Sequence, residues 1–221
     1  MVKIKSYDGT ELYYEYSKGD KSKPVLVFLH GVGANLTLWR KEVAYFSKKG
    51  YGCLAMDLRG HGNSQVPKRK KDFLLPCFVD DVEFILGKEK INNFVFVGHS
   101  FGGSVIITYL VSDKKNMPSS VVLTESTYRY PFPEGKDLNM NPLVVYLMKF
   151  AINKKLFRRT ASKEIDLNNK SHLSMVFDEL YYLPLQTIIY SLQGAKLGSP
   201  IYNDRIVSMF SNTEMPFLLV A

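Results

Sequence analysis

The chain has 221 residues, which is enough for one large α/β domain with room for an insertion. Its apolar content of 46% is ordinary for a globular protein, and no apolar stretch is long enough to span a bilayer. The formal net charge is +8, but the excess lies in short lysine and arginine runs without interleaved aromatic residues. We therefore expect a solvated basic surface and no nucleic-acid partner.

The cysteines and the first residues indicate a reducing compartment. Two cysteines, Cys53 and Cys77, are too few for a disulfide framework, and Cys53 falls in a predicted strand as a buried thiol. The N-terminal residues 1–5 lack the apolar core of a signal peptide. We therefore expect a cytoplasmic protein without an integral membrane segment.

The N-terminal third begins with a predicted hairpin. Residues 2–6 and 11–17 alternate apolar and polar side chains, and the Asp8-Gly9 pair between them is a turn signal. The apolar run 24–29 then predicts a strand covered on both faces, which ends in His30-Gly31-Val32-Gly33.

The next elements alternate helix and strand. An amphipathic helix is expected from Leu36 to Lys49, followed by a buried strand at 51–57 and a glycine-rich loop at 58–64. A basic loop leads to a helix at about 73–90. The alternation that runs from residue 24 to 125 predicts parallel strands joined by right-handed crossovers.

The sequence from Asn93 to Gly103 organises the whole chain. Its first part, 93–97, is a short run rich in Val and Phe that predicts a buried strand, and residues 104–110 predict a helix. Between them lies the Gly-x-Ser-x-Gly motif of residues 98–102. Such a motif also occurs by chance, but strand, sharp turn and helix together are typical of a nucleophile elbow. A further strand is predicted at 120–124.

The pattern changes after residue 130. Between 131 and 205 the sequence predicts several helices and no strand, which we interpret as an inserted helical cap. The expected cap helices are Leu143–Phe150, His172–Leu183 and Pro184–Gln193. Residues 215–221 then predict a return to the sheet. The expected division is therefore 1–130 for the first part of the core, 131–205 for the cap and 206–221 for the return to a truncated core.

The predicted elbow explains the residue types around Ser100. The serine has to adopt a strained backbone conformation that lifts its hydroxyl clear of the sheet, which requires uncrowded neighbours at Gly98 and Gly102. The N-terminal N–H groups of the following helix favour developing negative charge at the same place.

The chain resembles the α/β-hydrolase family over nearly its whole length. The resemblance rests on His30-Gly31-Val32-Gly33, on residues 57–64 with the sequence Asp-Leu-Arg-Gly-His-Gly-Asn-Ser, on Gly98-His99-Ser100-Phe101-Gly102-Gly103, and on the strand at 216–220. It implies a mostly parallel twisted sheet with flanking helices and an inserted cap. The chain is most similar to the capped serine-nucleophile branch of carboxylesterases, monoacylglycerol lipases and carbon–carbon bond hydrolases. A serine at the elbow argues against the aspartate-nucleophile epoxide hydrolases and dehalogenases.

The resemblance also implies roles for single residues. Ser100 is the expected nucleophile, which would form an acyl-enzyme with a carbonyl substrate. The expected oxyanion-hole donors are the backbone N–H groups of Val32 and Phe101. Gly31 lets the loop approach closely, and His30 is expected to be a structural hydrogen-bonding residue.

Three further polar residues near these motifs have structural interpretations. His61 is expected to shape the core beside the site. His99 should point away from Ser100 and line the interior of the fold, and we do not favour it as the base. Asp57 is expected to hold the Arg59 loop by hydrogen bonds.

The chain departs from the family where the triad acid and base belong. Both are expected after the strand that ends at Ala221, so we interpret the chain as C-terminally incomplete and expect little triad-dependent turnover from it. His172 lies in the predicted cap, where an exposed or packed role is favoured. Glu125 is a weak candidate acid, because some relatives place the acid after the strand that follows the elbow helix.

Three classes of function remain open. The leading one is a serine hydrolase of carboxylic esters with an apolar portion bound under the cap, working on a small-molecule substrate without a metal or cofactor. The second is acyl transfer, thioester hydrolysis or cofactor-free haloperoxidase chemistry on the same fold. The third is a non-catalytic binding protein, which the intact elbow disfavours because binding alone needs no strained serine.

Overall fold

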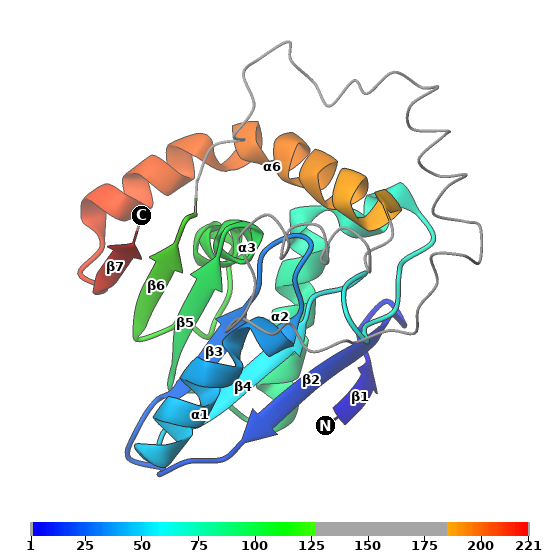
Figure 1. Cartoon of the computed structure of the whole chain (residues 1–221). Helices are drawn as coiled ribbons and strands as arrows, with labels where there is room; N and C mark the ends of the chain where they lie inside the picture. Colours follow the sequence, from blue (N-terminus) through cyan, green and yellow to red (C-terminus); the bar gives the residue numbers. More distant parts are fainter. Residues whose placement is uncertain (1, 127–184, 221) are drawn as a thin grey trace.

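A seven-stranded sheet forms the centre of the molecule in a computed structural model, which describes residues 2–126 and 185–220 (Figure 1). The strand order is β1-β2-β4-β3-β5-β6-β7. The strands are β1 (Val2–Lys5), β2 (Glu11–Ser17), β3 (Val25–Leu29), β4 (Gly52–Asp57), β5 (Phe94–His99), β6 (Ser120–Thr124) and β7 (Phe217–Val220). The predicted N-terminal hairpin and the predicted return strand are both confirmed.

The sheet is parallel from β4 to β7, while β1 and β2 run antiparallel at one edge. The register pairs Leu29 with Gly98 and Gly98 with Leu123. The carboxyl ends of β3, β5 and β6 therefore meet at one edge of the sheet, which is where ligands bind in open α/β sheets.

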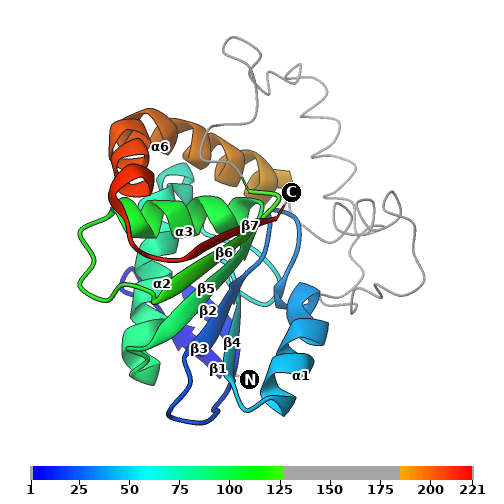
Figure 2. The same ribbon diagram turned by 90° about the vertical axis from the view of Figure 1, so that its left-hand side faces the viewer.

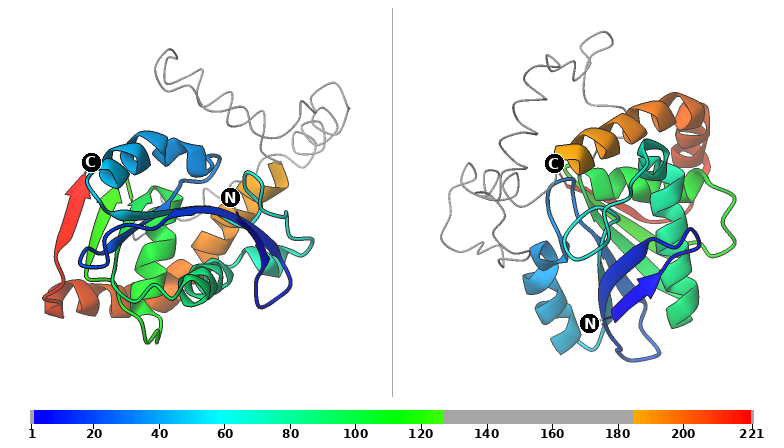
Figure 3. Two further views of the ribbon diagram at one scale, coloured as in Figure 1. Left: turned by 90° about the horizontal axis from the view of Figure 1, so that it is seen from below. Right: turned by 90° about the vertical axis from the view of Figure 1, so that its right-hand side faces the viewer.

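Helices cover both faces of the sheet. They are η1 (Leu36–Trp39), α1 (Arg40–Lys48), η2 (Lys70–Phe73), α2 (Leu75–Glu89), α3 (Phe101–Val111) and α6 (Leu185–Asn212). Among the described helices, α1 lies on one face and α2, α3 and α6 lie on the other (Figure 2). Figure 3 shows the twist of the sheet between these two layers.

The sides of β5 show why its sequence lacks a polar face. Phe94 and Phe96 are buried in the core cluster under α2 and α3. Val95 and Val97 pack against the smaller cluster around Phe28 on the α1 side. Both faces of this strand therefore carry apolar side chains, as expected for a parallel strand between two helical layers.

The helix expected from Leu36 to Lys49 begins differently from the prediction. Its first turn is the 3-10 helix η1, because the Asn35 carboxamide accepts the Thr37 N–H at 2.9 Å and fixes a tighter turn. The regular helix α1 starts only at Arg40. It ends at Lys48, close to the expected stop at Gly50, which has φ +83°.

Helix α6 contains most of the expected helix 184–193 but continues to Asn212, across the expected cap boundary at residue 205. It packs on α3, α2 and η2. The Thr187 hydroxyl near its start donates to the Gly60 carbonyl at 3.1 Å, and Ile206 near its end is buried in the core. The other two expected cap helices lie outside the described residues, so the three-part division stays a prediction.

None of the helices within residues 2–126 and 185–220 is long and apolar enough to cross a membrane.

Candidate active site

Ser100 occupies the strained turn that the sequence predicts. It joins β5 to α3 with φ +50° and ψ −113°, a combination that non-glycine residues rarely adopt. Its N–H donates to the Thr124 carbonyl at 3.0 Å, and its carbonyl accepts the Gly103 N–H at 2.9 Å. The strain is thus held by hydrogen bonds to β6 on one side and to α3 on the other.

The two glycines of the motif are required by close packing. A Cβ on Gly98 would collide with the Ile106 side chain, and a Cβ on Gly102 would collide with the backbone carbonyl of Leu29. Any side chain at these positions would push α3 away from β3 and β5. The elbow therefore depends on both glycines for reasons of space.

The loop after β3 lies directly beside the elbow. A Cβ placed on Gly31 would lie 2.8 Å from His99 Nδ1 and 3.3 Å from the Cβ of Ser100, so a larger residue would force one of these neighbours to shift. Val32 is half-buried and packs on the main core, while Phe101 at the start of α3 is buried against Phe78 with ring centroids 5.1 Å apart. The backbone at 31–32 and the N-terminus of α3 therefore flank Ser100, as the expected oxyanion hole requires. The roles of Val32 and Phe101 as donors stay predictions.

His30 connects the loops that follow β3 and β4. Its Nδ1–H donates to the Gly31 carbonyl at 2.7 Å, and its Nε2 accepts the Leu58 N–H at 3.0 Å. The ring is fully buried, and burial, together with the neighbouring His61, holds the pKa of His30 well below its usual value. A neutral ring with both nitrogens used fits the structural role that the sequence predicts, because it has no nitrogen left for proton transfer.

Asp57 makes a second connection between the same loops. Its carboxylate accepts the Leu36 N–H and the Asn63 N–H, each at 2.7 Å, and the residue is 1% exposed. Burial raises the pKa of Asp57 to about 6, although both hydrogen bonds oppose the shift. The expectation that Asp57 holds the following loop is confirmed by the bond to Asn63.

His61 packs edge-on against His30, with ring centroids 5.1 Å apart. Its Nδ1–H donates to the Arg59 carbonyl at 3.0 Å, and its Nε2 has no partner among the described residues. Burial lowers the pKa of His61 to about 4, so the ring is neutral near pH 7. This placement matches the expected role beneath the site.

His99 differs from the expectation that it lines the interior. Its Nε2 hydrogen-bonds to Glu125 Oε2 at 3.1 Å, and its side chain keeps 31% of its exposure. The prediction failed because side chains alternate along β5: residues 95, 97 and 99 face the α1 layer, and at the end of the strand no helix among the described residues covers that face. Glu125, the weak candidate acid, therefore contacts His99.

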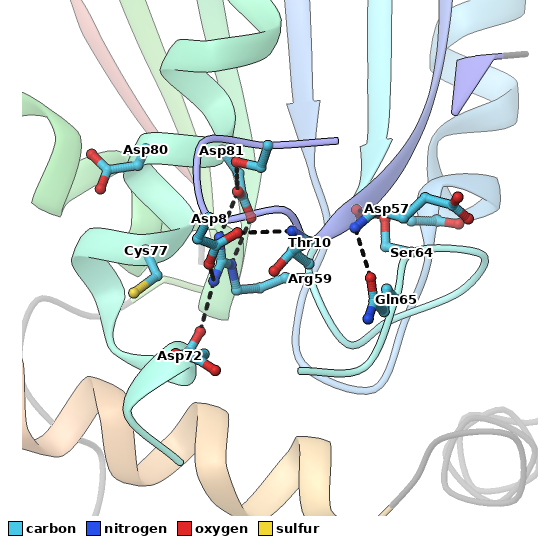
Figure 4. A network of polar contacts seen from close by, with 12 residues as sticks. Asp8, Thr10, Asp57, Arg59, Ser64, Gln65, Asp72, Cys77, Asp80 and Asp81 are labelled. Carbon is cyan, nitrogen blue, oxygen red and sulfur yellow. Dashed lines mark hydrogen bonds and ion pairs between the residues drawn. The ribbon is translucent and has the colours of Figure 1, made fainter. Parts of the chain in front are cut away.

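Arg59 forms a buried ion-pair network that the sequence analysis missed (Figure 4). Its guanidinium donates to Asp81 at 2.6 and 2.7 Å, to Asp8 at 2.9 Å and to the Asp72 carbonyl at 3.0 Å. Ser6 donates to Asp81 at 2.5 Å. We call Ser6, Asp8, Arg59, Asp72 and Asp81 the Arg59 network. Burial opposes the charge on Arg59, but Asp81 and Asp8 outweigh it and raise the pKa of Arg59. No local sequence pattern indicated it, because the partners of Arg59 come from the hairpin, the η2 turn and α2.

In the part of the chain that the structure describes, we find a groove away from the elbow and no candidate metal site. Those residues contain no group of three histidine, cysteine, aspartate or glutamate side chains placed to hold a metal ion. A groove of about 490 Å³ lies between β2, β4 and α1 and is lined by residues such as Tyr16, Val43 and Cys53. None of its lining residues belongs to the elbow or to the loop at Gly31.

His172 lies outside the described residues, so the structure assigns it no place. Within residues 2–126, no histidine hydrogen-bonds to the Ser100 hydroxyl.

Comparison with known proteins agrees with this geometry. A family model described as the alpha/beta hydrolase fold matches residues 24–175. Epoxide hydrolase 3 of Xenopus tropicalis is 30% identical over 120 residues, which cover 54% of this chain and 32% of that protein. A non-heme chloroperoxidase of Streptomyces lividans is 27% identical over 126 residues, covering 57% of this chain and 45% of that protein. The chain is also similar in fold to an esterase from Exiguobacterium antarcticum, with a TM-score of 0.63, 18% identity, and coverage of 88% of this chain and 72% of the esterase.

The matched stretches cover between 24% and 45% of the length of the curated relatives.

Proposed function

The chain belongs to the α/β-hydrolase fold family, and from this premise we propose that the protein is a serine hydrolase that cleaves carboxylic esters through an acyl-enzyme at Ser100. The observation that carries the proposal is the backbone of Ser100. A non-glycine residue at φ +50° between a strand and a helix costs roughly 1–3 kcal/mol of strain. Backbone strain of this kind is concentrated at active sites and ligand-binding sites.

The proposed reaction uses the elbow and the loop beside it. The Ser100 hydroxyl oxygen attacks the carbonyl carbon of the ester, its proton passes to a general base, and the alcohol leaves with a proton. Water then cleaves the acyl-enzyme. The N–H groups of Val32 and Phe101 are proposed to bind the oxyanion, and each such donor is typically worth about 2.7–4 kcal/mol. We do not assign the role of general base to any histidine in residues 2–126.

The substrate and the organisation of the chain are part of the same proposal. We propose a small ester with an apolar portion bound beneath a cap at residues 131–205. The core at 1–130 and the return at 206–221 would carry the elbow and its supporting sheet. We further propose that the protein acts in the cytoplasm without a nucleic-acid partner.

The name of one relative favours a second candidate reaction. One relative is named an epoxide hydrolase and another a non-heme chloroperoxidase. The aspartate-nucleophile mechanism of epoxide hydrolases does not fit a serine at the elbow. A cofactor-free haloperoxidase or acyl-transfer reaction, in contrast, uses the same serine. Product analysis with competing alcohol, thiol and peroxide acceptors separates these reactions from simple ester hydrolysis.

Covalent labelling tests the proposal. We expect a fluorophosphonate to form one adduct on the whole protein, which peptide mass spectrometry places on Ser100. The Ser100→Ala protein should remain unlabelled under the same conditions, and Ser104→Ala, one turn along α3, is the matched control that should label normally. An adduct on another residue, or a wild-type protein that resists labelling, would contradict the proposal.

A further inference from the structure

We propose that His99 and Glu125 form a positioning pair that holds the loop at Gly31 in place beside Ser100. This inference rests on the proposed function, because the loop matters only if it binds the oxyanion. It assigns Glu125 a role through His99 in place of the direct role of a triad acid. Neither residue would touch the reacting atoms.

The contact between the two side chains fixes the state of the His99 ring. Glu125 Oε2 lies 3.1 Å from His99 Nε2, and a carboxylate only accepts hydrogen bonds. When the ring is neutral, its hydrogen therefore sits on Nε2, and Nδ1 carries the lone pair. Nδ1 is buried and has no partner among the described residues. The hydrogen bond to Glu125 thus sets both the tautomer and the rotation of the ring.

The backbone around Glu125 anchors its end of the pair. Glu125 follows β6 with φ +47°, and its N–H donates to the Val220 carbonyl of β7 at 2.8 Å. A non-glycine residue in this left-handed conformation aims its side chain in a direction that an ordinary strand end would not allow. Because Thr124, the preceding residue, also accepts the Ser100 N–H, the pair and the elbow share one support.

The other end of the pair contacts the loop. A Cβ placed on Gly31 would lie 2.8 Å from His99 Nδ1 and 3.3 Å from the Cβ of Ser100. The imidazole edge and Ser100 therefore pack against the same point of the Gly31 backbone. Rotating or removing the ring would free that backbone to move. The adjacent Val32 N–H would move with it, and an oxyanion donor acts only when it is already in place.

The exposure of Glu125 argues against a role in stability. Its side chain is 69% exposed, and exposed pairs of this kind contribute little to folding. Loss of its carboxylate should therefore leave the fold intact. Any effect on the site would come from the orientation of His99.

The test separates binding of a fluorophosphonate from the bond-forming step by measuring KI and the rate constant of inactivation. We expect Glu125→Ala and His99→Phe to lower the rate constant about tenfold, with KI changed less than about twofold, because misplacing a donor slows the reaction without weakening initial binding. The double variant should be no slower than either single variant. Glu125→Gln should retain most of the rate, since its amide oxygen accepts the same hydrogen bond. Glu83→Ala, which removes a surface carboxylate paired with Lys114, is the matched control and should match wild type.

Other results would contradict the proposed positioning role of His99 and Glu125. Wild-type rates in both Glu125→Ala and His99→Phe would show that the loop does not depend on it. A Glu125→Gln protein as slow as Glu125→Ala would mean that the negative charge matters, which is the behaviour of a triad acid. Losses that follow a fall in melting temperature would indicate a purely structural role. A wild-type protein that is not labelled at Ser100 would instead refute the proposed function, and the role of the pair with it.

Discussion

The elbow region, which comprises His99, Ser100 and Glu125, and the Arg59 network are both polar clusters assembled from distant parts of the chain. They differ in how far their polar groups are buried and hydrogen-bonded. In the Arg59 network, Arg59 and Asp81 are at most 1% exposed, and each has several hydrogen-bond partners. In the elbow region, Ser100 is half-buried and strained, and His99 carries a buried nitrogen without a partner among the described residues.

This difference indicates that the Arg59 network stabilises the fold and that the elbow region carries the reactivity. Buried charges that are fully paired hold elements together, and removing one partner leaves the other charge uncompensated. The network joins the N-terminal hairpin, the loop after β4 and helix α2 in this way. The half-buried, strained Ser100 contributes nothing comparable to folding. We therefore expect changes in the network to alter stability and changes at the elbow to alter reactivity.

The largest effect on stability is expected from Arg59→Met. Asp81 is fully buried, and without Arg59 it keeps only the Ser6 hydroxyl as a partner among the contacts described. Breaking a buried pair in this way typically costs about 3–5 kcal/mol, which urea unfolding would measure.

The double variant Arg59→Met/Asp81→Leu is the matched control, because it removes both charges and should recover part of the loss. The fraction of Arg59→Met that remains folded should still label at Ser100. If Arg59→Met were as stable as wild type, the conclusion that the Arg59 network stabilises the fold would be wrong.

A smaller effect is expected from pH at Asp57, which holds the loops after β3 and β4 together. The folded pKa of about 6 exceeds the ordinary value of 3.8, so the folded state keeps a proton that the unfolded state releases. The contribution of Asp57 to stability is therefore full below about pH 4 and falls as the pH rises through about 6. The shift corresponds to at most about 3 kcal/mol.

Other carboxylates change stability over the same pH range, so the measurement is the difference between wild type and Asp57→Asn. The free energy of unfolding of wild type minus that of Asp57→Asn should decrease from about pH 4 to about pH 7. A difference that stays constant or grows with pH would show that burial does not disfavour the charged form.

The smallest effect on stability is expected from Ser100→Gly. Glycine adopts φ +50° without the steric cost that serine bears, so the variant should unfold with a free energy roughly 1 kcal/mol higher, while losing all fluorophosphonate labelling. Thermal unfolding measures the first effect and mass spectrometry the second.

Ser100→Ala separates the backbone from the hydroxyl. It should also lose labelling but gain no stability, because alanine keeps the Cβ that makes this conformation costly. Equal melting temperatures for Ser100→Gly and wild type would mean that the turn stores no strain.

Much of the fold was predictable because its signals are local. The apolar run of β3, the hairpin around Gly9 and the strand–turn–helix at Ser100 each lie within about 20 consecutive residues. The elbow glycines were also predictable, although the structure gives their reason as collisions with Ile106 and Leu29.

Contacts between distant residues were not predictable in this way. The sequence suggests His99 and Glu125 separately, but their hydrogen bond depends on the parallel pairing of β5 with β6. The partners of Arg59 come from the hairpin, the η2 turn and α2. Helix α6 runs as one element through residue 205 because it packs on α3 and α2, which no local pattern indicates.

Trapping the acyl-enzyme tests the central claim most directly. The whole protein would be mixed with a p-nitrophenyl acyl ester, quenched in acid within the first turnover and digested for peptide mass spectrometry. We expect the acyl group on Ser100 alone and none in Ser100→Gly. An acyl group on a different residue, or ester cleavage that continues in Ser100→Gly, would contradict the assignment of Ser100 as the nucleophile.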